Sequence, residues 1–497
     1  MEREDILIHV DNRLGRDNHD GIHQPVETAD KAFSLLPPYW HGSAEIRFVV
    51  TDIPYPIRKS AVYFGTPIGP DASSLVIRGD YAQHPDFAEV AATTASTGDE
   101  VITSIDIPAD RLLGAVLRRL TRRSPEGSPI GTAISIRGNS SGPTSKILLQ
   151  RTIGAVAPGD TFVIEQPAVT LVPDPPPHDP IPAEAGQALN LTSHDGRSPN
   201  LKLVGIKFAP FEGRGLNLLN VRAVCDTCEF LFKRTSDRDP KSTIFYLHTD
   251  ARIQGGVEGN PERASAGAYI HSDNPSNVVW ATRGGVLGGH LTFDKITVRA
   301  SQGGVFVPKS LEAREAPIQI LAGGAAIAEP QKEGNVVVGG WGTASNKARI
   351  RNVGGDGLRL FNGGSMNSPA SPTHLDIFGC SGDGIRLDVG SSASFGPTTR
   401  FDPARGTETG GETGLVTTGT PINHGFGMNV RNGSRAFVAK DEALADRNDR
   451  LAGSSGDVAL DDVVVGDAAR GHGWAAVRTP RTNARLSLVC VNSGRPV

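Results

Sequence analysis

Histidine and aspartate side chains recur in two short segments that share the pattern His-x-Asp. The first segment, LHTDARI, contains His248 and Asp250, and the second, IHSDNPS, contains His271 and Asp273. The two pairs are 23 residues apart. If the chain coils with about that period, the four side chains stack on one face as a mixed patch of imidazoles and carboxylates. Such a patch could bind a metal ion or a sugar, or it could be a solvated ladder.

Two aromatic residues, Tyr269 and Trp280, lie close to this patch in the sequence. Sugars dock on aromatic faces flanked by carboxylates, because the ring is apolar and the carboxylate accepts hydrogen bonds from hydroxyl groups. We therefore expect a carbohydrate groove here. The expected substrate-binding residues are His248, His271, Tyr269 and Trp280, and the catalytic candidates are Asp250 and Asp273.

A second pair of carboxylates comes from an internal repeat. GDGLRLFNGGS, residues 355–365, returns as GDGIRLDVGSS, residues 382–392, with seven of eleven positions identical. In a 27-residue register, Asp356 and Asp383 would stack within about 5 Å of each other. Two carboxylates so close repel each other when both are ionised, so the pKa of one would rise. Such a pair could serve in acid–base catalysis or bind calcium. The alternative is that each aspartate caps its own corner, where the glycines supply positive φ.

Other motifs that carry chemistry are sparse. Cys225 and Cys228 form a single CxxC with no second CxxC and no nearby histidine pair, which argues against zinc. Alternation along an extended strand would place the two thiols on opposite faces, as packing residues. The sequence has no GxSxG, P-loop or HExxH motif, and no GxGxxG motif before a helix. We expect no cofactor and no metal site, with calcium at the paired aspartates as the open alternative.

Short apolar strands must position these side chains. Residues 203–208, 216–224, 291–298 and 374–378 each carry apolar residues at period two and are bounded by turn-forming residues. Gly (59) and Pro (35) are abundant enough to exclude helical repeats. Strands repeating every 22–27 residues, roughly, predict a parallel β-helix, in which each coil lies about 4.8 Å from the next. In the repeated segment the leucines and Ile385 point inward, and Arg359 and Arg386 point outward.

The segment DNRLGRDNHDGIHQPVETADKAFSLLP, residues 11–37, carries a family signature. The matching residues are Gly15, Asp17, Asp20, Gly21, Pro25, Thr28 and Ala32. It resembles the opening of right-handed parallel β-helix proteins of the pectate-lyase-like superfamily, which is common in phage tailspikes and in extracellular polysaccharide-degrading enzymes. The resemblance implies a short helix, capped by Thr28 and stopped by Pro37, that covers the open end of the solenoid.

A third candidate site is the GHG at residues 471–473. In the polygalacturonase branch of this superfamily a GHG follows two aspartates and precedes an Arg-x-Lys. Here Asp461 and Asp462 precede His472, but the gap is shorter and no Arg-x-Lys follows. We therefore expect His472 to occupy a corner like those of Asp356 and Asp383.

The expected fold is all-β, a right-handed parallel β-helix with an N-terminal helical cap and accessory segments. We expect the cap and first coils in residues 1–83, an insertion in 84–184, the main β-helix in 185–400, and C-terminal coils or a cap in 401–497. The insertion is expected to contain a helix over 109–123 and a Pro-rich linker over 172–184. A polar loop is expected at 396–420 and a short surface helix at 440–452.

The net charge of −4 provides no electrostatic footprint for nucleic acid, and no run of about 18 apolar residues spans a membrane. The N-terminus lacks the features of a signal peptide, so we expect assembly in the host cytoplasm. The resemblance implies a structural or receptor-binding component of a phage or phage-like virion. Such a component recognises bacterial surface polysaccharide, contacts other particle proteins and is a homotrimer. The alternatives are a polysaccharide lyase or glycoside hydrolase, and a non-catalytic scaffold in a larger assembly.

Overall fold

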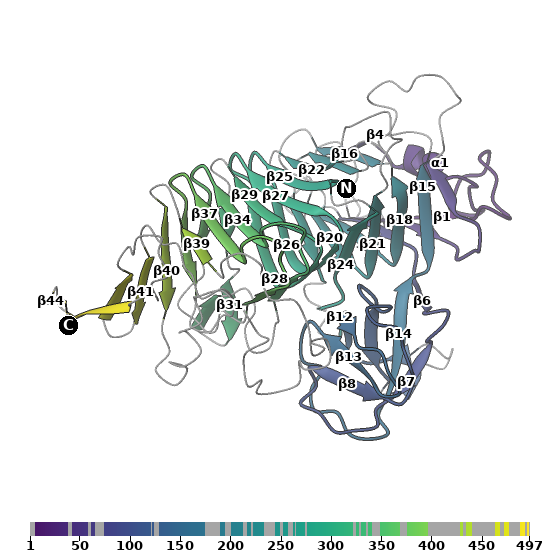
Figure 1. Ribbon diagram of the computed structural model, residues 1–497. Coiled ribbons are helices and arrows are strands. Elements are labelled where there is room, and N and C mark those ends of the chain that lie inside the picture. Colours follow the sequence, from purple (N-terminus) through teal and green to yellow (C-terminus); the bar gives the residue numbers. More distant parts are fainter. Residues whose placement is uncertain are drawn as a thin grey trace. The chain divides into compact units, whose positions relative to one another are not determined.

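A computed structural model describes most of the chain up to residue 395 and short strands beyond it (Figure 1). The described residues are 5–37, 42–57, 61–64, 74–120, 122–123, 129–173, 189–193, 200–211, 216–219, 222–232, 244–248, 252–256, 262–263, 265–273, 276–321, 325–327, 330–333, 336–339, 348–367, 375–395, 428–430, 434–439, 463–467, 472–476, 488–492 and 495–496. They fall into two compact units. The first comprises residues 1–149, 153–280 and 284–292, and the second comprises 150–152, 281–283 and 293–497.

The coils of the first unit consist of three strands, each paired in parallel with its counterpart on the next coil. The first stack contains β1 (Ile6–Val10), β2 (Ser43–Phe48), β5 (Ser74–Arg78), β17 (Asn200–Val204), β20 (Arg222–Asp226), β23 (Arg252–Gly255) and the start of β26 (Val286–Asp294). The second stack contains β3 (Tyr55–Ile57), β15 (Val169–Pro173), β18 (Ile206–Phe211), β21 (Cys228–Phe232) and β24 (Ala268–Ser272). The third contains β4 (Ala61–Phe64), β16 (Leu189–Ser193), β19 (Leu216–Leu219) and β22 (Ile244–His248).

A single left-handed residue turns the chain from the first stack to the second. Gly205 has φ +60° at this corner, and Thr227 has φ +52° at the equivalent corner of the next coil. A Cβ on Gly205 would lie 1.6 Å from the carbonyl oxygen of Asp80, so only glycine fits there. Beyond each corner, apolar side chains alternate into the core, where the rings of Phe208 and Phe230 stack 5.0 Å apart. The predicted parallel β-helix is therefore confirmed.

The N-terminal signature folds as a loop followed by helix α1 (Ala29–Leu35). The hydroxyl of Thr28 accepts a hydrogen bond from the backbone N–H of Lys31, which confirms the predicted N-cap. Asp17 fixes the cap residue in turn, since its carboxylate accepts from both the N–H and the hydroxyl of Thr28. Asp20 accepts from three successive N–H groups and from the ring of His23, and these bonds lower its pKa. No helix in the described part of the chain is long and apolar enough to cross a membrane.

An antiparallel module interrupts the first unit at the corner between β5 and β15. It comprises β6 (Tyr81–Gln83), β7 (Glu89–Ala91), β8 (Glu100–Thr103), β9 (Val116–Arg119), β12 (Ala133–Asn139), β13 (Ser145–Leu149) and β14 (Thr161–Pro167). Its strands enclose a core that includes Val101, Leu117, Ile147 and Phe162.

The helix predicted over 109–123 is wrong. Asp110 and Gly114 have φ of +57° and +80°, which an α-helix does not accommodate, and residues 116–119 form β9. This strand is paired on both sides, with β12 and β14. The two flanking strands supply the backbone hydrogen bonds that a helix would have made itself, so tertiary pairing overrides the helical spacing of the leucines. A short pair of strands, β10 (Arg122–Arg123) and β11 (Pro129–Ile130), follows.

The second unit repeats the three-stranded coil. One stack contains β28 (Val305–Arg314), β33 (Ala348–Arg351) and β36 (Leu375–Phe378), and another contains the start of β28 with β30 (Ala325–Ile327), β35 (Ser365–Asn367), β38 (Ser392–Phe395) and β40 (Arg435–Ala439). The third contains β27 (Thr297–Ser301), β29 (Ile318–Leu321), β34 (Leu358–Phe361), β37 (Ile385–Asp388) and β39 (Met428–Val430). Strand β25 (Val278–Thr282) and β26 span residues of both units.

Antiparallel strands accompany the coils of the second unit. These are the hairpin β31 (Pro330–Glu333) and β32 (Val336–Gly339), and the meander β41 (Val463–Asp467), β42 (His472–Ala476), β43 (Leu488–Asn492) and β44 (Arg495–Pro496). His472 opens an antiparallel strand and does not take the corner position expected for it. Residues 461–462, the polar loop at 396–420, the surface helix at 440–452 and the linker beyond residue 173 lie outside the described residues.

Candidate functional site

The two predicted histidines are not stacked. His248 ends β22 in the third stack, opposite Leu219, whereas His271 lies on β24 in the second stack, opposite Leu231. A step of 23 residues from His248 carries the chain around two corners rather than one full coil, so the expected register is wrong. Coils with the same three strands differ in length because their loops differ in length. The alternation of apolar residues in the strands does not predict the length of the loops between them.

The other residues of that predicted patch are dispersed. Asp250 and the side chain of His248 lie outside the described residues. Asp273 is exposed at the end of β24, where its backbone N–H donates to the carbonyl of Phe232. Trp280 is half-buried on β25, a different strand stack from Tyr269 and His271. Of the predicted carbohydrate groove, the structure brings together Tyr269 and His271.

The 27-residue register of the repeated segment is confirmed, since Leu358 pairs with Ile385 and Arg359 with Arg386. The carboxylate of Asp356 accepts a hydrogen bond of 2.9 Å from the backbone N–H of Asp383. Its second oxygen lies 3.7 Å from a guanidinium nitrogen of Arg386. Asp356 therefore caps the corner of the following coil.

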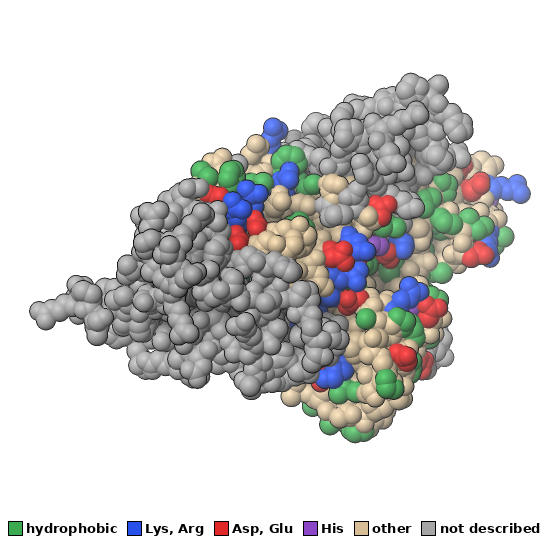
Figure 2. Space-filling view, viewed as in Figure 1, with side chains coloured by type: hydrophobic (Ala, Val, Ile, Leu, Met, Phe, Trp, Pro, Cys, Tyr) green, Lys and Arg blue, Asp and Glu red, His purple; other side chains and the backbone are tan. Residues whose placement is uncertain are grey.

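Tyr269 and His271 belong to a cluster on the outer face of the second stack, which we call the Glu229 cluster: Lys207, Glu229, Tyr269 and His271. Lys207 on β18 pairs in register with Glu229 on β21, and Glu229 pairs with Tyr269 on β24. His271 follows two residues after Tyr269 and therefore points to the same side of the strand. Figure 2 shows a histidine beside acidic and basic side chains over β21 and β24.

Glu229 is the centre of the cluster. Its Oε1 lies 2.6 Å from Nζ of Lys207 and 2.8 Å from Nε2 of His271. Burial alone would raise the pKa of Glu229, but the hydrogen bonds and charges of His271 and Lys207 outweigh burial and hold that pKa below its ordinary value. Glu229 is therefore an ionised acceptor at neutral pH.

The rings of Tyr269 and His271 stack in parallel, with centroids 4.2 Å apart and an interplanar angle of 1°. The backbone of Gly114, in the antiparallel module, lies against the Tyr269 ring, since a Cβ at Gly114 would be 2.2 Å from that ring. The aromatic pair is thus fixed by contact with the module. The cluster presents an ammonium group, a carboxylate, an imidazole and a phenol, which can donate to and accept from sugar hydroxyl groups.

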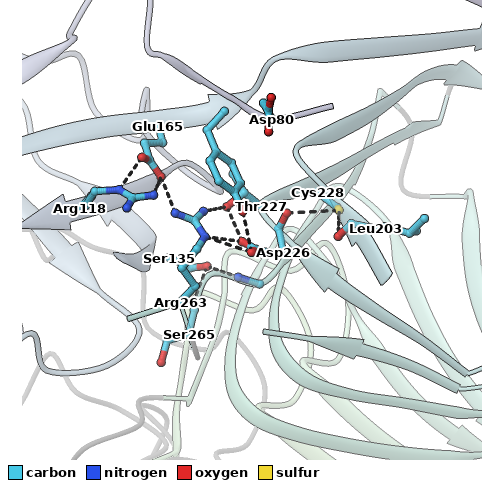
Figure 3. Close-up of polar contacts among 12 residues, drawn as sticks. Asp80, Arg118, Ser135, Glu165, Leu203, Asp226, Thr227, Cys228, Arg263 and Ser265 are labelled. Carbon is cyan, nitrogen blue, oxygen red and sulfur yellow. Dashed lines mark hydrogen bonds and ion pairs between the residues drawn. The ribbon is translucent and has the colours of Figure 1, made fainter. Parts of the chain in front are cut away.

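A buried ion-pair network holds the module against the coils (Figure 3). Arg263 donates to both carboxylate oxygens of Asp226, at 2.8 and 3.0 Å, and to Glu165 at 2.9 Å. Glu165 in turn accepts from Arg118 at 2.6 Å, and both of these residues belong to the module. The guanidinium of Arg263 also lies 3.6 Å from the centroid of the Tyr81 ring.

Each charge in this network is compensated by another. The side chains of Arg263, Asp226 and Glu165 are 7%, 2% and 4% exposed, respectively. Burial alone would lower the pKa of Arg263, but Asp226 and Glu165 raise it overall. The hydroxyl of Tyr81 donates to Asp226 at 2.7 Å, and burial raises the pKa of this tyrosine. The network fixes the module rigidly to the corner of the coil, and so fixes Gly114 over the Glu229 cluster.

Sequence reasoning missed Lys207 and Glu229. Their signal was present in three triplets of apolar, polar and apolar residues, IKF at 206–208, CEF at 228–230 and AYI at 268–270. Each triplet opens a strand of the second stack, and the central residues Lys207, Glu229 and Tyr269 pair in register and face outward. An alignment of these triplets would have found the cluster, whereas the His-x-Asp repeat did not.

The two thiols of the CxxC lie on the same side of the coil wall, contrary to the alternation expected from an extended strand. Thr227, at φ +52°, turns the chain between them, so Cys225 and Cys228 both point into the core and are 0% and 2% exposed. The Cys228 thiol donates to the carbonyl of Leu203 at 3.3 Å. Among the residues that the structure describes, no group of three or more His, Cys, Asp or Glu side chains could hold a metal ion.

No protein-family model matches the chain, and no curated protein matches it. Among solved structures, the chain is similar to the Gp54 tailspike of Acinetobacter baumannii bacteriophage AP22, in complex with A. baumannii capsular saccharide, with 10% identity and a TM-score of 0.23 over 85% of this chain and 74% of that one. It is also similar to the tailspike protein gp49 of Pseudomonas phage LKA1, with 9% identity and a TM-score of 0.18 over 80% and 72% of the two chains.

Proposed function

We propose that the protein is a tailspike-like β-helix that binds a bacterial surface polysaccharide. The observation that carries this proposal is the Glu229 cluster, in which charged and aromatic groups lie in register on the outer face of a rigid coil. Sugar hydroxyl groups need such alternating donors and acceptors, and a preorganised site binds them with less loss of conformational entropy. The N-terminal signature of the pectate-lyase-like superfamily supports the same function.

We also propose the assembly that the resemblance implies, a homotrimer that is part of a phage or phage-like particle and is assembled in the host cytoplasm. Stacked parallel coils suit an appendage that holds a binding surface away from a particle. The mass of the purified protein in solution, measured by multi-angle light scattering, distinguishes a trimer from a monomer.

The binding proposal is tested with the full chain and a panel of purified bacterial surface polysaccharides on a glycan array. We expect saturable binding to at least one member. Glu229→Gln should weaken that binding at least about tenfold, because a hydrogen bond to a charged group contributes about 1.5–3 kcal/mol. Glu89→Gln, which changes an exposed glutamate of the module, is the matched control and should leave binding unchanged. If the folded protein binds no member of the panel, a non-catalytic scaffold is favoured instead.

A second function, cleavage of the bound glycan, is favoured by one contact. Nε2 of His271 lies 2.8 Å from Glu229, the geometry of a base held by an orienting carboxylate. New reducing ends would report hydrolysis, and ultraviolet absorbance of an unsaturated uronate would report elimination. In a cleaving enzyme, His271→Asn should abolish turnover even when the glycan is present at saturating concentration. Asp250→Asn, Asp273→Asn and Asp383→Asn test the carboxylates proposed from the sequence in the same assay.

A further inference from the structure

A row of basic and polar side chains runs along the outer face of the third stack in the second unit. Arg299 pairs in register with Gln319, Gln319 with Arg359, and Arg359 with Arg386. All four side chains are half-buried, while their neighbours within each strand point into the core. Figure 2 shows basic and acidic side chains gathered over β34 and β37, the strands of Arg359 and Arg386. We call this set the arginine row.

Each member of the arginine row is held in place by a neighbour. The side-chain oxygen of Gln319 accepts from Nε and Nη2 of Arg299, at 3.3 and 3.1 Å. Arg386 lies 3.2 Å from the carboxylate of Asp388 and 3.7 Å from that of Asp356. The guanidinium of Arg359 lies 5.0 Å from the centroid of the Phe361 ring.

The charges of the row are incompletely compensated. Arg359 and Arg386 occupy directly opposed positions on adjacent strands, about 4.8 Å apart, where like charges destabilise a sheet. Within the described residues, no ion pair joins Arg359 to a carboxylate, and its Nε, like that of Arg386, is buried without an acceptor. An anion placed between Arg359 and Arg386 would give Arg359 a carboxylate partner and reduce the repulsion.

An apolar row runs beside the arginine row. Leu321 pairs in register with Phe361, and both side chains are half-buried on the outer face. The surface therefore has guanidinium groups along one line and two apolar side chains along the next, where Asp388 occupies the following register position. A sugar acid matches this arrangement, because a pyranose ring has an apolar face and its carboxylate lies at one edge.

We propose that the arginine row binds the carboxylates of a linear, uronate-containing polysaccharide, with the sugar rings against Leu321 and Phe361. This inference rests on the proposed polysaccharide-binding function and specifies the charge of the ligand. The planar guanidinium of arginine binds a carboxylate through two parallel hydrogen bonds, which lysine cannot do. A repeating anion fits a repeating cation because each coil places one side chain at a fixed rise along the row.

The experiment measures binding of the full chain to polygalacturonate, to alginate and to neutral dextran by isothermal titration calorimetry. We expect both acidic polymers to bind, dextran not to bind at this surface, and affinity for the acidic polymers to fall as NaCl is raised. Arg359→Gln and Arg386→Gln should each weaken binding at least about tenfold. Arg359→Lys should recover only part of the loss, because the charge is kept and the two-bond geometry is not.

Arg47→Gln is the matched control, since Arg47 is an exposed arginine of the first unit and its loss should not change binding. Circular dichroism and thermal unfolding verify that each variant is folded. Binding of acidic polymers that Arg359→Gln and Arg386→Gln leave intact would overturn the inference, and so would a higher affinity for duplex DNA than for either polymer. If the chain binds only neutral glycans of the panel, the inference fails and the proposed function stands. If it binds no glycan at all, the proposed function itself fails.

Discussion

The carboxylate of Asp356 accepts a hydrogen bond from the backbone N–H of Asp383 on the next coil, at 2.9 Å. A second hydrogen bond joins the same two corners, since the N–H of Gly357 donates to the carbonyl of Asp383 at 3.0 Å. The repeated Gly-Asp-Gly is thus a corner that links successive coils. A Cβ at Gly382 would lie 2.5 Å from the Asp356 carboxylate, which explains why glycine precedes the second aspartate.

Asp356→Ala should therefore lower the free energy of unfolding by about 1 kcal/mol, because the amide of Asp383 loses its acceptor. Asp356→Asn keeps an oxygen at the same place and should stay close to the wild type. Urea denaturation followed by circular dichroism measures both. A catalytic carboxylate would give another pattern, in which both variants are as stable as the wild type and neither cleaves glycan.

Removal of Arg263 tests the ion-pair network between module and coil. Arg263→Met leaves Asp226 and Glu165 buried without their shared partner, which typically costs about 3–5 kcal/mol. We expect a lower midpoint of urea unfolding and faster proteolysis within the module. The matched control is Arg119→Met, which breaks the half-exposed pair of Arg119 and Asp160 and should cost at most about 1 kcal/mol. Equal effects of the two substitutions would contradict the assigned role of Arg263.

Gly114 is predicted to tolerate no side chain. Gly114→Ala introduces a Cβ that would lie 2.2 Å from the Tyr269 ring, at a φ of +80° that L-residues disfavour. We expect a loss of about 1–3 kcal/mol in stability and a displaced Tyr269. Gly159→Ala separates the two causes, because Gly159 has a similar φ of +90° and no atom within 4 Å of the added Cβ. If both variants lose the same stability in urea denaturation, the contact between Gly114 and Tyr269 contributes nothing to it.

The fold was predictable because its signals are local. Period-two apolar strands and the capping of α1 by Thr28 follow from neighbouring residues, and the pairing of Leu358 with Ile385 follows from an exact sequence repeat. The Glu229 cluster was not predictable in the same way. Lys207, Glu229 and Tyr269 are brought into register by coils whose loops have different lengths, so no fixed spacing marks them.

Two wrong predictions, the opposite faces of the CxxC thiols and the helix over 109–123, have the same physical cause. In each segment a residue other than glycine adopts the left-handed conformation. Thr227 turns Cys225 and Cys228 to the same side, and Asp110, at φ +57°, interrupts the segment over 109–123 where a helix was expected. Positive φ at a residue other than glycine has no reliable sequence signal, since the surrounding pairing imposes it. Strand patterning therefore identifies which residues alternate, but not where a corner reverses the alternation.

The stability of the first unit should depend on acidic pH through Glu229. Burial raises the pKa of Glu229, and the hydrogen bonds and charges of His271 and Lys207 lower it. The lowering is larger, so the folded-state pKa lies below the ordinary value near 4.5. Its contribution is therefore fully present above about pH 4.5 and is lost as the pH falls through the folded-state pKa. Glu229→Gln should be less stable than the wild type by about 1.5–3 kcal/mol at pH 7, and the difference should shrink below pH 4.5. Urea denaturation between pH 7 and pH 3 measures this difference, with Glu89→Gln as the exposed control. A difference that stays constant over the whole range would show that Glu229 stabilises the coil by packing rather than by its charge.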